Sequence, residues 1–245
     1  MPQLRVVSYN VHRAVGRDRR TEPARILDVL REIDADIVAL QEVEACDAGA
    51  DMLAWLGEQT GFHAIPGTTL IRHDGHFGNG ILSRFPVQRV THCDLSWRGR
   101  EPRAAIAADL ELADGEPLRF VATHLGLRPA ERRDQVTRLL KLFTDRPYER
   151  AVLVGDLNEW FLWGRPLRRL HRYFKSTPSP ATFPARLPVL ALDRVWTHPR
   201  ALLRGLAVHR TPLARMASDH LPLVATLETT AARTKALEPQ MTSAA

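Results

Sequence analysis

The chain has 245 residues, 44% of them hydrophobic, and 34 basic against 28 acidic residues give it a formal net charge of +6. This length and apolar content can bury a sizeable core, and a sandwich of this size is commonly one domain. No stretch approaches the length of a membrane span, and no apolar leader segment precedes the first strand. The two cysteines, Cys46 and Cys93, do not have the spacing of a disulfide framework or a zinc site. We therefore expect a cytoplasmic protein.

Four segments have the pattern of helices. The first covers residues 21–33 with Pro23 near its start, and the second covers residues 51–60 and is closed by Gly61. The third covers residues 129–143 and the fourth residues 163–174. In the third, the apolar period places four side chains inward: Val136, Leu139, Leu140 and Phe143. It places three arginines outward: Arg132, Arg133 and Arg138.

Six apolar runs, each predicted to be a strand, have polar residues at one end. Five of them run into polar residues: 4–9 into Asn10, 36–40 into Gln41-Glu42, 118–122 into Thr123-His124, 151–154 into Gly155-Asp156-Leu157-Asn158, and 190–192 into Asp193. Before the sixth run, at 223–227, stands Ser218-Asp219-His220. A buried strand with polar groups at its end aims them into a cleft. Helices and strands mix without strict alternation, which predicts an α/β sandwich of two packed mixed β-sheets flanked by helices.

The order and spacing of these motifs, over positions 8 to 227, resemble the endonuclease/exonuclease/phosphatase superfamily of divalent-metal phosphodiesterases and phosphatases. The matching pieces are Ser8-Tyr9-Asn10-Val11, Gln41-Glu42-Val43, Gly78-Asn79-Gly80-Ile81-Leu82-Ser83, Thr123-His124-Leu125, Gly155-Asp156-Leu157-Asn158, Leu192-Asp193-Arg194-Val195 and Ser218-Asp219-His220. The resemblance implies the four-layer fold of deoxyribonuclease I. It implies one domain over residues 1–228, and we expect the tail at 229–245, rich in Thr, Ala and Ser, to be disordered.

Carboxylate oxygens suit a hard ion, so we expect Mg²⁺ or Mn²⁺ as the cofactor. Glu42 is the first choice as metal ligand, with Asn10 as a neutral neighbour. The resemblance implies the other roles, including that of Asp219, which helps to hold the metal side. Asp156 orients or deprotonates the attacking water, Asn158 holds a phosphate oxygen, and His124 donates to the phosphate or the leaving group. His220, oriented by Asp193, contacts the scissile phosphate or acts as acid and base.

Three further residues are candidates for substrate binding or positioning. Arg103 is either a phosphate clamp or a surface residue at a strand start. Secreted deoxyribonucleases orient their first catalytic histidine with a glutamate, whereas the region upstream of Ser83 here offers only His73, Asp74, His76 and Asn79. Asn79 can fix the ring of His124 by a hydrogen bond, although a neutral amide cannot stabilise an imidazolium. Trp160 opens the apolar run Trp160-Phe161-Leu162-Trp163, which either packs the cleft wall, rests on an anionic membrane surface or stacks on a base.

Two arginine-rich clusters are expected near the mouth of the cleft, where they would attract an anionic substrate. They consist of Arg128, Arg132 and Arg133, and of Arg165, Arg168, Arg169, His171, Arg172 and Lys175. The favoured function is a metal-dependent phosphodiesterase acting on nucleic acid or on a phospholipid or small phosphodiester. The alternatives are a phosphomonoesterase of the same fold and a non-catalytic phosphate-binding module. No obligate protein partner is predicted.

Overall fold

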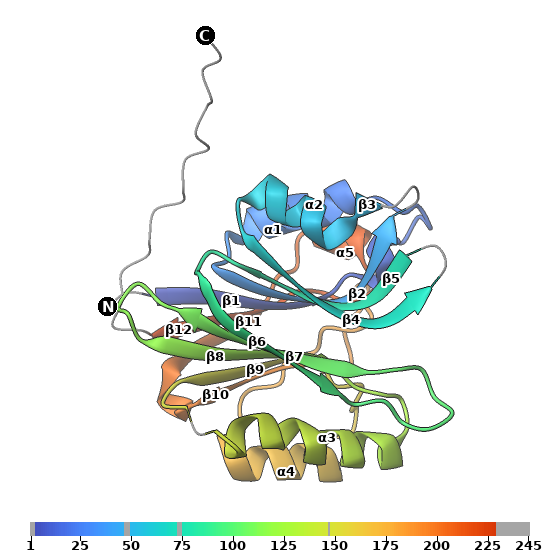
Figure 1. Ribbon diagram of the computed structural model, residues 1–245. Helices are drawn as coiled ribbons and strands as arrows, with labels where there is room; N and C mark the ends of the chain where they lie inside the picture. Colours follow the sequence, from blue (N-terminus) through green and yellow to red (C-terminus); the bar gives the residue numbers. More distant parts are fainter. Residues whose placement is uncertain (1–2, 47–49, 73–74, 147, 229–245) are drawn as a thin grey trace.

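The computed structural model describes residues 3–46, 50–72, 75–146 and 148–228. The tail predicted at 229–245 lies outside this part of the chain. Two β-sheets pack face to face, and helices cover the outer face of each, so the molecule has four layers (Figure 1). The predicted α/β sandwich of two mixed sheets is confirmed.

The first sheet has the strand order β11-β12-β1-β2-β5-β4, with β3 paired to β2 outside this path. Its strands are β1 (Gln3–Asn10), β2 (Ile37–Cys46), β3 (Ala50–Asp51), β4 (His63–Arg72), β5 (Gly75–Ser83), β11 (Leu203–Val208) and β12 (Leu223–Glu228). The second sheet has the order β10-β9-β8-β7-β6. Its strands are β6 (Val87–Asp94), β7 (Ala104–Glu111), β8 (Pro117–His124), β9 (Ala151–Asp156) and β10 (Asp193–His198).

Helices α1 (Pro23–Ile33), α2 (Met52–Thr60) and α5 (Pro212–Ala217) pack on the first sheet. Helices α3 (Pro129–Thr144) and α4 (Arg165–Phe174) pack on the second. Two short 3₁₀ helices, η1 (His12–Ala14) and η2 (Arg200–Leu202), lie in connections. The Pro-rich connection at 177–188 contains no helix or named strand, and Phe183 within it forms an isolated β-bridge to Leu190.

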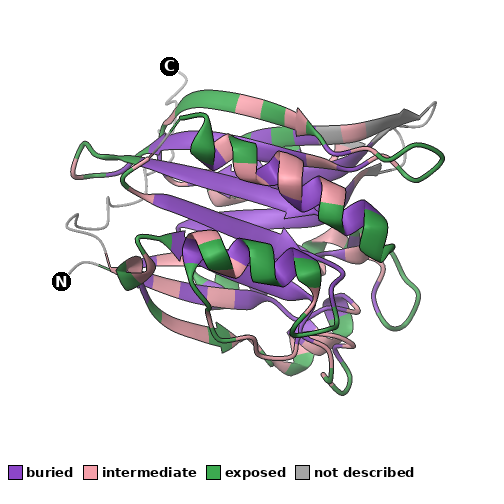
Figure 2. Ribbon diagram, turned by 90° about the horizontal axis from the view of Figure 1, so that it is seen from below, coloured by how far each residue is buried: buried purple, intermediate pink, exposed green. Residues whose placement is uncertain are grey.

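The alternation of side chains along the strands divides the core into three parts. On β1, Val6 faces the other sheet and Val7 faces the helices, because successive side chains of a strand point to opposite faces. Phe120 and Val152 continue the core between the sheets. Figure 2 shows these inner strands as buried over most of their length. The central strands are therefore covered on both faces, whereas β6 at the edge of the second sheet is largely exposed.

The helix ends follow local signals in the sequence. Helix α1 begins with Pro23 and ends at Asp34, whose left-handed φ of 50° stops it. In α2, the Asp51 carboxylate caps the helix by accepting hydrogen bonds from two backbone N–H groups, and Gly61 closes it at a φ of 70°. All four predicted helices are present, with their ends within two residues of the predicted positions.

One strand prediction was wrong in detail. The apolar run at 190–192 is not a strand; Asp193 is instead the first residue of β10. Because β10 is antiparallel to β9, the first residue of β10 lies beside the last residue of β9. Asp193 therefore pairs with Asp156. Asp156 also pairs with His124, since β8 and β9 are parallel. The three polar residues therefore lie side by side at the same end of the sheet, although Asp193 is the first residue of its strand and His124 and Asp156 are the last residues of theirs.

Candidate active site

The site lies at one end of the sandwich, where ends of strands from both sheets come together. His124, Asp156 and Asp193 occupy adjacent positions across β8, β9 and β10 of the second sheet. From β1 of the first sheet, Asn10 donates a hydrogen bond from Nδ2 to Oδ2 of Asp156 at 3.2 Å. All four side chains are almost fully buried, so their positions are fixed by the packed strands. His220, just before β12, completes the group.

Backbone conformation explains the Gly-Asp-Leu-Asn motif. Gly155 has a φ of 148°, and a Cβ atom there would stand 1.9 Å from the carbonyl oxygen of Thr123 in the neighbouring strand. Only glycine allows β9 to approach β8 so closely at this point. Asn158 and Glu42 have left-handed φ values of 51° and 57°, which are uncommon for residues with a side chain. Such backbone strain is often found at functional sites.

His220 is held by a buried carboxylate. Its Nδ1 lies 2.8 Å from Oδ2 of Asp193, which also accepts a hydrogen bond of 2.6 Å from the Thr182 hydroxyl. The other ring nitrogen, Nε2, lies 3.7 Å from Oδ2 of Asp156. Burial alone would lower the pKa of His220, but the carboxylates around it, above all Asp193, raise the pKa to about 10.

His124 has the opposite character. Burial, followed by the nearby guanidinium of Arg103, lowers the pKa of His124 to about 3. Arg103 places Nη1 3.1 Å from Nδ1 of the ring, and because a guanidinium can only donate, Nδ1 must accept. The ring proton is therefore on Nε2, which lies 3.5 Å from Oδ2 of Asp156. Asn158 Nδ2, 3.0 Å from Nε2, donates instead to the carbonyl oxygen of Leu125 at 2.9 Å. The two histidines thus differ in charge at neutral pH.

The residue that contacts the ring of His124 is Arg103, not Asn79. Arg103 is buried beside His124 and also pairs with Glu101 at 3.0 Å, so it is not a surface residue at a strand start. Asn79 donates to the carbonyl oxygen of Ala104 at 3.0 Å and joins β5 of one sheet to β7 of the other. The side-chain amide of Asn79 therefore links the two sheets, and it does not fix the ring of His124.

The residues predicted to face a metal ion lie beside this group. Oε1 of Glu42 accepts a hydrogen bond of 3.0 Å from Asn10 Nδ2, which also reaches Asp156. Asp219 has a 41% exposed side chain, and its Oδ1 lies 3.8 Å from Nδ1 of His12. Within the described ranges, no group of three or more His, Cys, Asp or Glu side chains is arranged to hold a metal ion. A site with one or two carboxylates, completed by water and substrate phosphate, is the usual environment of Mg²⁺, so the donor set fits this ion.

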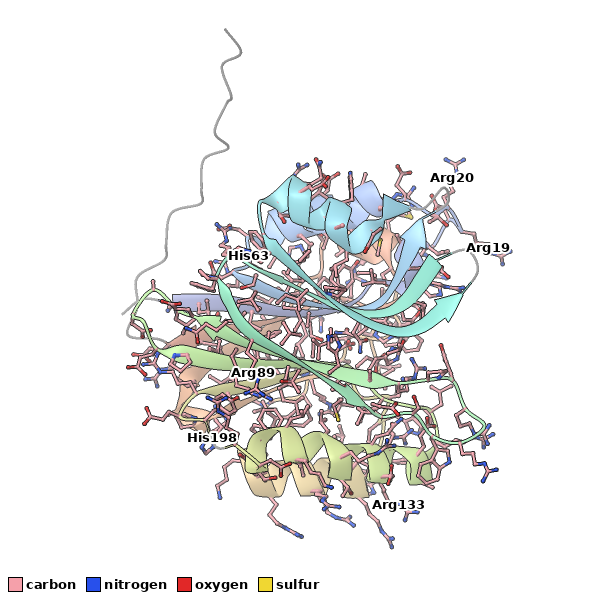
Figure 3. All side chains as sticks on the ribbon, in the orientation of Figure 1. Arg19, Arg20, His63, Arg89, Arg133 and His198 are labelled. Carbon is pink, nitrogen blue, oxygen red and sulfur yellow. The ribbon has the colours of Figure 1, made fainter. Side chains whose placement is uncertain are left out.

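Arg132 was predicted to point outward, and this prediction was wrong. Its side chain is fully buried, and its Nε and Nη2 each lie 3.2 Å from Oε2 of Glu159, directly after Asn158. Sequence reasoning also missed Glu159. The signal was present, because Arg132 precedes the inward-facing Val136 by four residues and therefore shares its helix face. Arg133, one residue further, is exposed as predicted (Figure 3).

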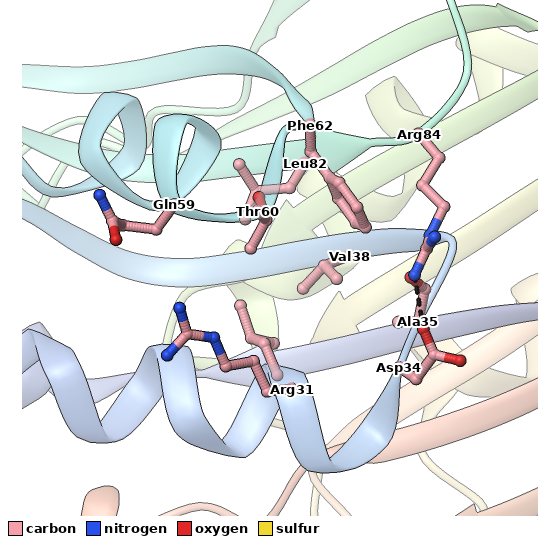
Figure 4. Close-up of a pocket in the computed structure, with 10 residues that line it drawn as sticks. Arg31, Asp34, Ala35, Val38, Gln59, Thr60, Phe62, Leu82 and Arg84 are labelled. Carbon is pink, nitrogen blue, oxygen red and sulfur yellow. Dashed lines mark hydrogen bonds and ion pairs between the residues drawn. The ribbon is translucent and has the colours of Figure 1, made fainter. Parts of the chain in front are cut away.

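Trp160 lies next to the site and is partly exposed. The Arg132 guanidinium carbon lies 5.3 Å from the centre of its ring, so one end of the loop at 160–163 is tied to the buried ion pair. A separate pocket lies between α1 and α2, where Arg84 forms an ion pair with Asp34 (Figure 4). None of the candidate site residues lines that pocket, so it is distinct from the group around Asp156.

Comparison with known proteins shows the family. Residues 7–220 match the model of the endonuclease/exonuclease/phosphatase family. Uncharacterized protein YbhP of Escherichia coli K12 is 30% identical over 243 residues, which cover 91% of this chain and 95% of YbhP. The chain belongs to the endonuclease/exonuclease/phosphatase family.

Solved structures show the same fold. The endonuclease/exonuclease/phosphatase from Bacteroides vulgatus superposes with a TM-score of 0.77 at 17% identity, over 93% of this chain and 99% of that one. The catalytic domain of human nocturnin, solved with a bound sulfate anion, superposes with a TM-score of 0.74 at 22% identity, over 93% of each chain. Among the helices of the described part, none is long and apolar enough to cross a membrane.

Proposed function

We propose that this protein is a divalent-metal-dependent phosphodiesterase that hydrolyses a phosphodiester bond by in-line attack of an activated water. The observation that carries the proposal is the convergence of His124, Asp156, Asn158 and His220 at one edge of the sandwich, with Asp193 behind His220. Membership of a family of phosphoester hydrolases supports it. We further propose that Mn²⁺ can replace Mg²⁺. We also propose that the protein is cytoplasmic.

Asp156 is the residue best placed to orient the attacking water. Its Oδ1 accepts a hydrogen bond of 2.9 Å from the backbone N–H of Asn158, and its Oδ2 accepts one from Asn10. These contacts fix the carboxylate before substrate arrives, which lowers the cost of aligning water for in-line attack.

Three side chains are placed to hold the phosphate. His220 and His124 present their Nε2 atoms within 3.7 Å and 3.5 Å of Asp156, so a phosphate next to that carboxylate would lie within reach of both. The Asn158 amide lies 3.0 Å from Nε2 of His124. Donors fixed by packing stabilise the charge that develops on phosphate oxygens during attack. Asp193 positions His220 from behind.

Glu42 and Asn10 would hold the metal ion, with Asp219 as a further carboxylate for it. A bound Mg²⁺ would supply positive charge against the phosphate oxygens. The Asn10 amide donates hydrogen bonds to both Glu42 and Asp156. The proposed metal ligand and the proposed water-orienting residue are therefore coupled through one amide. This coupling supports placing both functions in one site.

The test is turnover of bis-p-nitrophenyl phosphate and p-nitrophenyl phosphate with Mg²⁺ or Mn²⁺. We expect faster cleavage of the diester, and a loss of at least about 100-fold in His220→Ala, the usual scale for a lost acid–base group. His63→Ala is the matched control, because His63 is exposed at the start of β4 (Figure 3), and it should keep the full rate. Faster cleavage of the monoester would favour a phosphomonoesterase. No turnover of either ester by folded protein would favour a binding module.

A further inference from the structure

Five large apolar side chains are exposed next to the candidate active site. Trp160, Phe161, Leu162 and Trp163, here called the aromatic loop, are 42%, 51%, 55% and 69% exposed, and Leu127 is 58% exposed. The aromatic loop begins two residues after Asn158. Contiguous apolar surface of this kind marks an interaction site in a water-exposed protein.

The loop is anchored by a buried ion pair. Arg132 pairs with Glu159 through Nε and Nη2, and its Nη1 donates to the carbonyl oxygens of Gly126 and Leu127 at 3.2 Å and 2.7 Å. One guanidinium therefore holds both segments that carry the exposed apolar side chains. Oε1 of Glu159 also accepts the backbone N–H of Phe161 at 3.2 Å.

The far end of the aromatic loop is equally constrained. A Cβ atom at Gly164 would lie 2.7 Å from the Glu159 carboxyl carbon, so a larger residue there would displace the carboxylate that pairs with Arg132. Arg168 donates to the carbonyl oxygen of Trp163 at 2.8 Å. Burying an ion pair has a large desolvation cost. Here it fixes a loop whose apolar side chains face water.

Arginine side chains lie beside the aromatic loop. A pocket of about 440 Å³ is lined by Phe161, Trp163 and three exposed arginines: Arg133, Arg165 and Arg168. The acidic side chain that lines it, Glu159, is already paired with Arg132. Arg128 is exposed beside Leu127. An apolar centre with a cationic rim is complementary to an anionic lipid surface, where acyl chains lie beneath charged headgroups.

The ring geometry favours lipid over nucleic acid. Successive rings of the aromatic loop are tilted by 55° between Trp160 and Phe161 and by 49° between Phe161 and Trp163. Consecutive bases need open ring faces on which to stack, and leucines offer none. Tryptophan and leucine side chains, in contrast, partition well into the boundary between headgroups and acyl chains.

The geometry points to docking of this protein on anionic phospholipid bilayers through the aromatic loop and its arginine rim, so that Asn158 and the candidate active site meet the phosphodiester of a lipid headgroup. This inference rests on the proposed function, because it names the surface on which the same site meets its substrate. Docking itself requires no catalysis and can be measured without it.

The experiment is co-sedimentation with vesicles of phosphatidylcholine, with and without about 30% phosphatidylglycerol, in EDTA. We expect binding to the anionic vesicles and a loss of about tenfold or more in partitioning for Leu162→Glu, since a charge replaces an inserted side chain. Val90→Glu is its matched control, at an exposed apolar position on β6. Arg133→Glu should also weaken binding, while Arg89→Glu, on β6 (Figure 3), should not.

Soluble bis-p-nitrophenyl phosphate separates this inference from the proposed function. If Leu162→Glu cleaves the soluble diester at the wild-type rate but loses vesicle binding, docking through the aromatic loop is supported. Vesicle binding that is equal for Leu162→Glu and wild type would overturn the inference, even with an active enzyme. Loss of single-stranded DNA binding without loss of vesicle binding in this variant would also overturn it. Vesicle binding by a protein that cleaves no phosphodiester would retain docking and reject only the function.

Discussion

Asp193→Asn is the most informative single change in the site, because it removes a charge and keeps the shape. Oδ2 of Asp193 accepts from both His220 Nδ1 and the Thr182 hydroxyl, whereas its buried Oδ1 has no hydrogen-bond partner. The asparagine oxygen can occupy the Oδ2 position and keep both contacts. The new NH₂ group must then occupy the Oδ1 position.

Two magnitudes follow from this geometry. A buried NH₂ group without an acceptor should cost about 1–3 kcal/mol of stability. Asp193 is also the strongest influence that raises the pKa of His220, so its loss should lower this pKa from about 10 toward or below the ordinary 6.5. With His220 less charged and less firmly oriented, diester hydrolysis should fall by about 10²–10⁴-fold.

The assay combines urea denaturation, kcat for bis-p-nitrophenyl phosphate with Mg²⁺, and an NMR titration of the His220 ring. Thr182→Val is the control, because it removes one hydrogen bond from Oδ2 and leaves the carboxylate charge. It should lose far less activity than Asp193→Asn. An Asp193→Asn protein with a wild-type rate and an unchanged His220 pKa would refute the role assigned to this pair.

Three further predictions concern the rest of the site. Gly155→Ala should destabilise the protein by roughly 2 kcal/mol or more in urea denaturation, since alanine disfavours the φ of 148° and its Cβ would clash with Thr123; an unchanged midpoint would show that β8 and β9 can separate. Glu42→Gln should raise the Mg²⁺ concentration for half-maximal activity by about tenfold or more, and an unchanged Mg²⁺ dependence would place the ion elsewhere. In EDTA, NMR should find His124 neutral down to about pH 3, below its ordinary 6.5. Because its folded-state pKa is lowered, the unfolded chain takes up the proton first, so this residue should reduce stability as pH falls from 6.5 toward 3. A His124 that titrates near 6.5 would contradict its burial beside Arg103.

The layers and most of the helices could be predicted because their signals are local. Pro23, Asp51 and Gly61 mark helix ends by their own backbone preferences, and apolar runs mark buried strands. The start of β10 could not be placed this way, because the residues before Asp193 are equally apolar. Pairing with β9, a contact distant in sequence, decides where that strand begins.

The site was predictable as a set of residues but not as a set of contacts. Motif order indicated His124, Asp156 and His220, and the structure places them together. The partner of His124 could not be predicted, because Arg103 is brought to it by the pairing of β7 with β8, in which Ala105 lies beside Thr123. The roles of these residues in catalysis remain predictions.

The most direct test of the central claim is the rate of bis-p-nitrophenyl phosphate hydrolysis by wild type and Asp156→Asn, each with Mg²⁺ and with EDTA. The arrangement around Asp156 predicts turnover only for the wild type with Mg²⁺, and a loss of at least about 100-fold in the variant, whose amide cannot accept the proton of the attacking water. Equal rates for the two proteins, or a wild-type rate that EDTA leaves unchanged, would contradict a metal-dependent phosphodiesterase at this site.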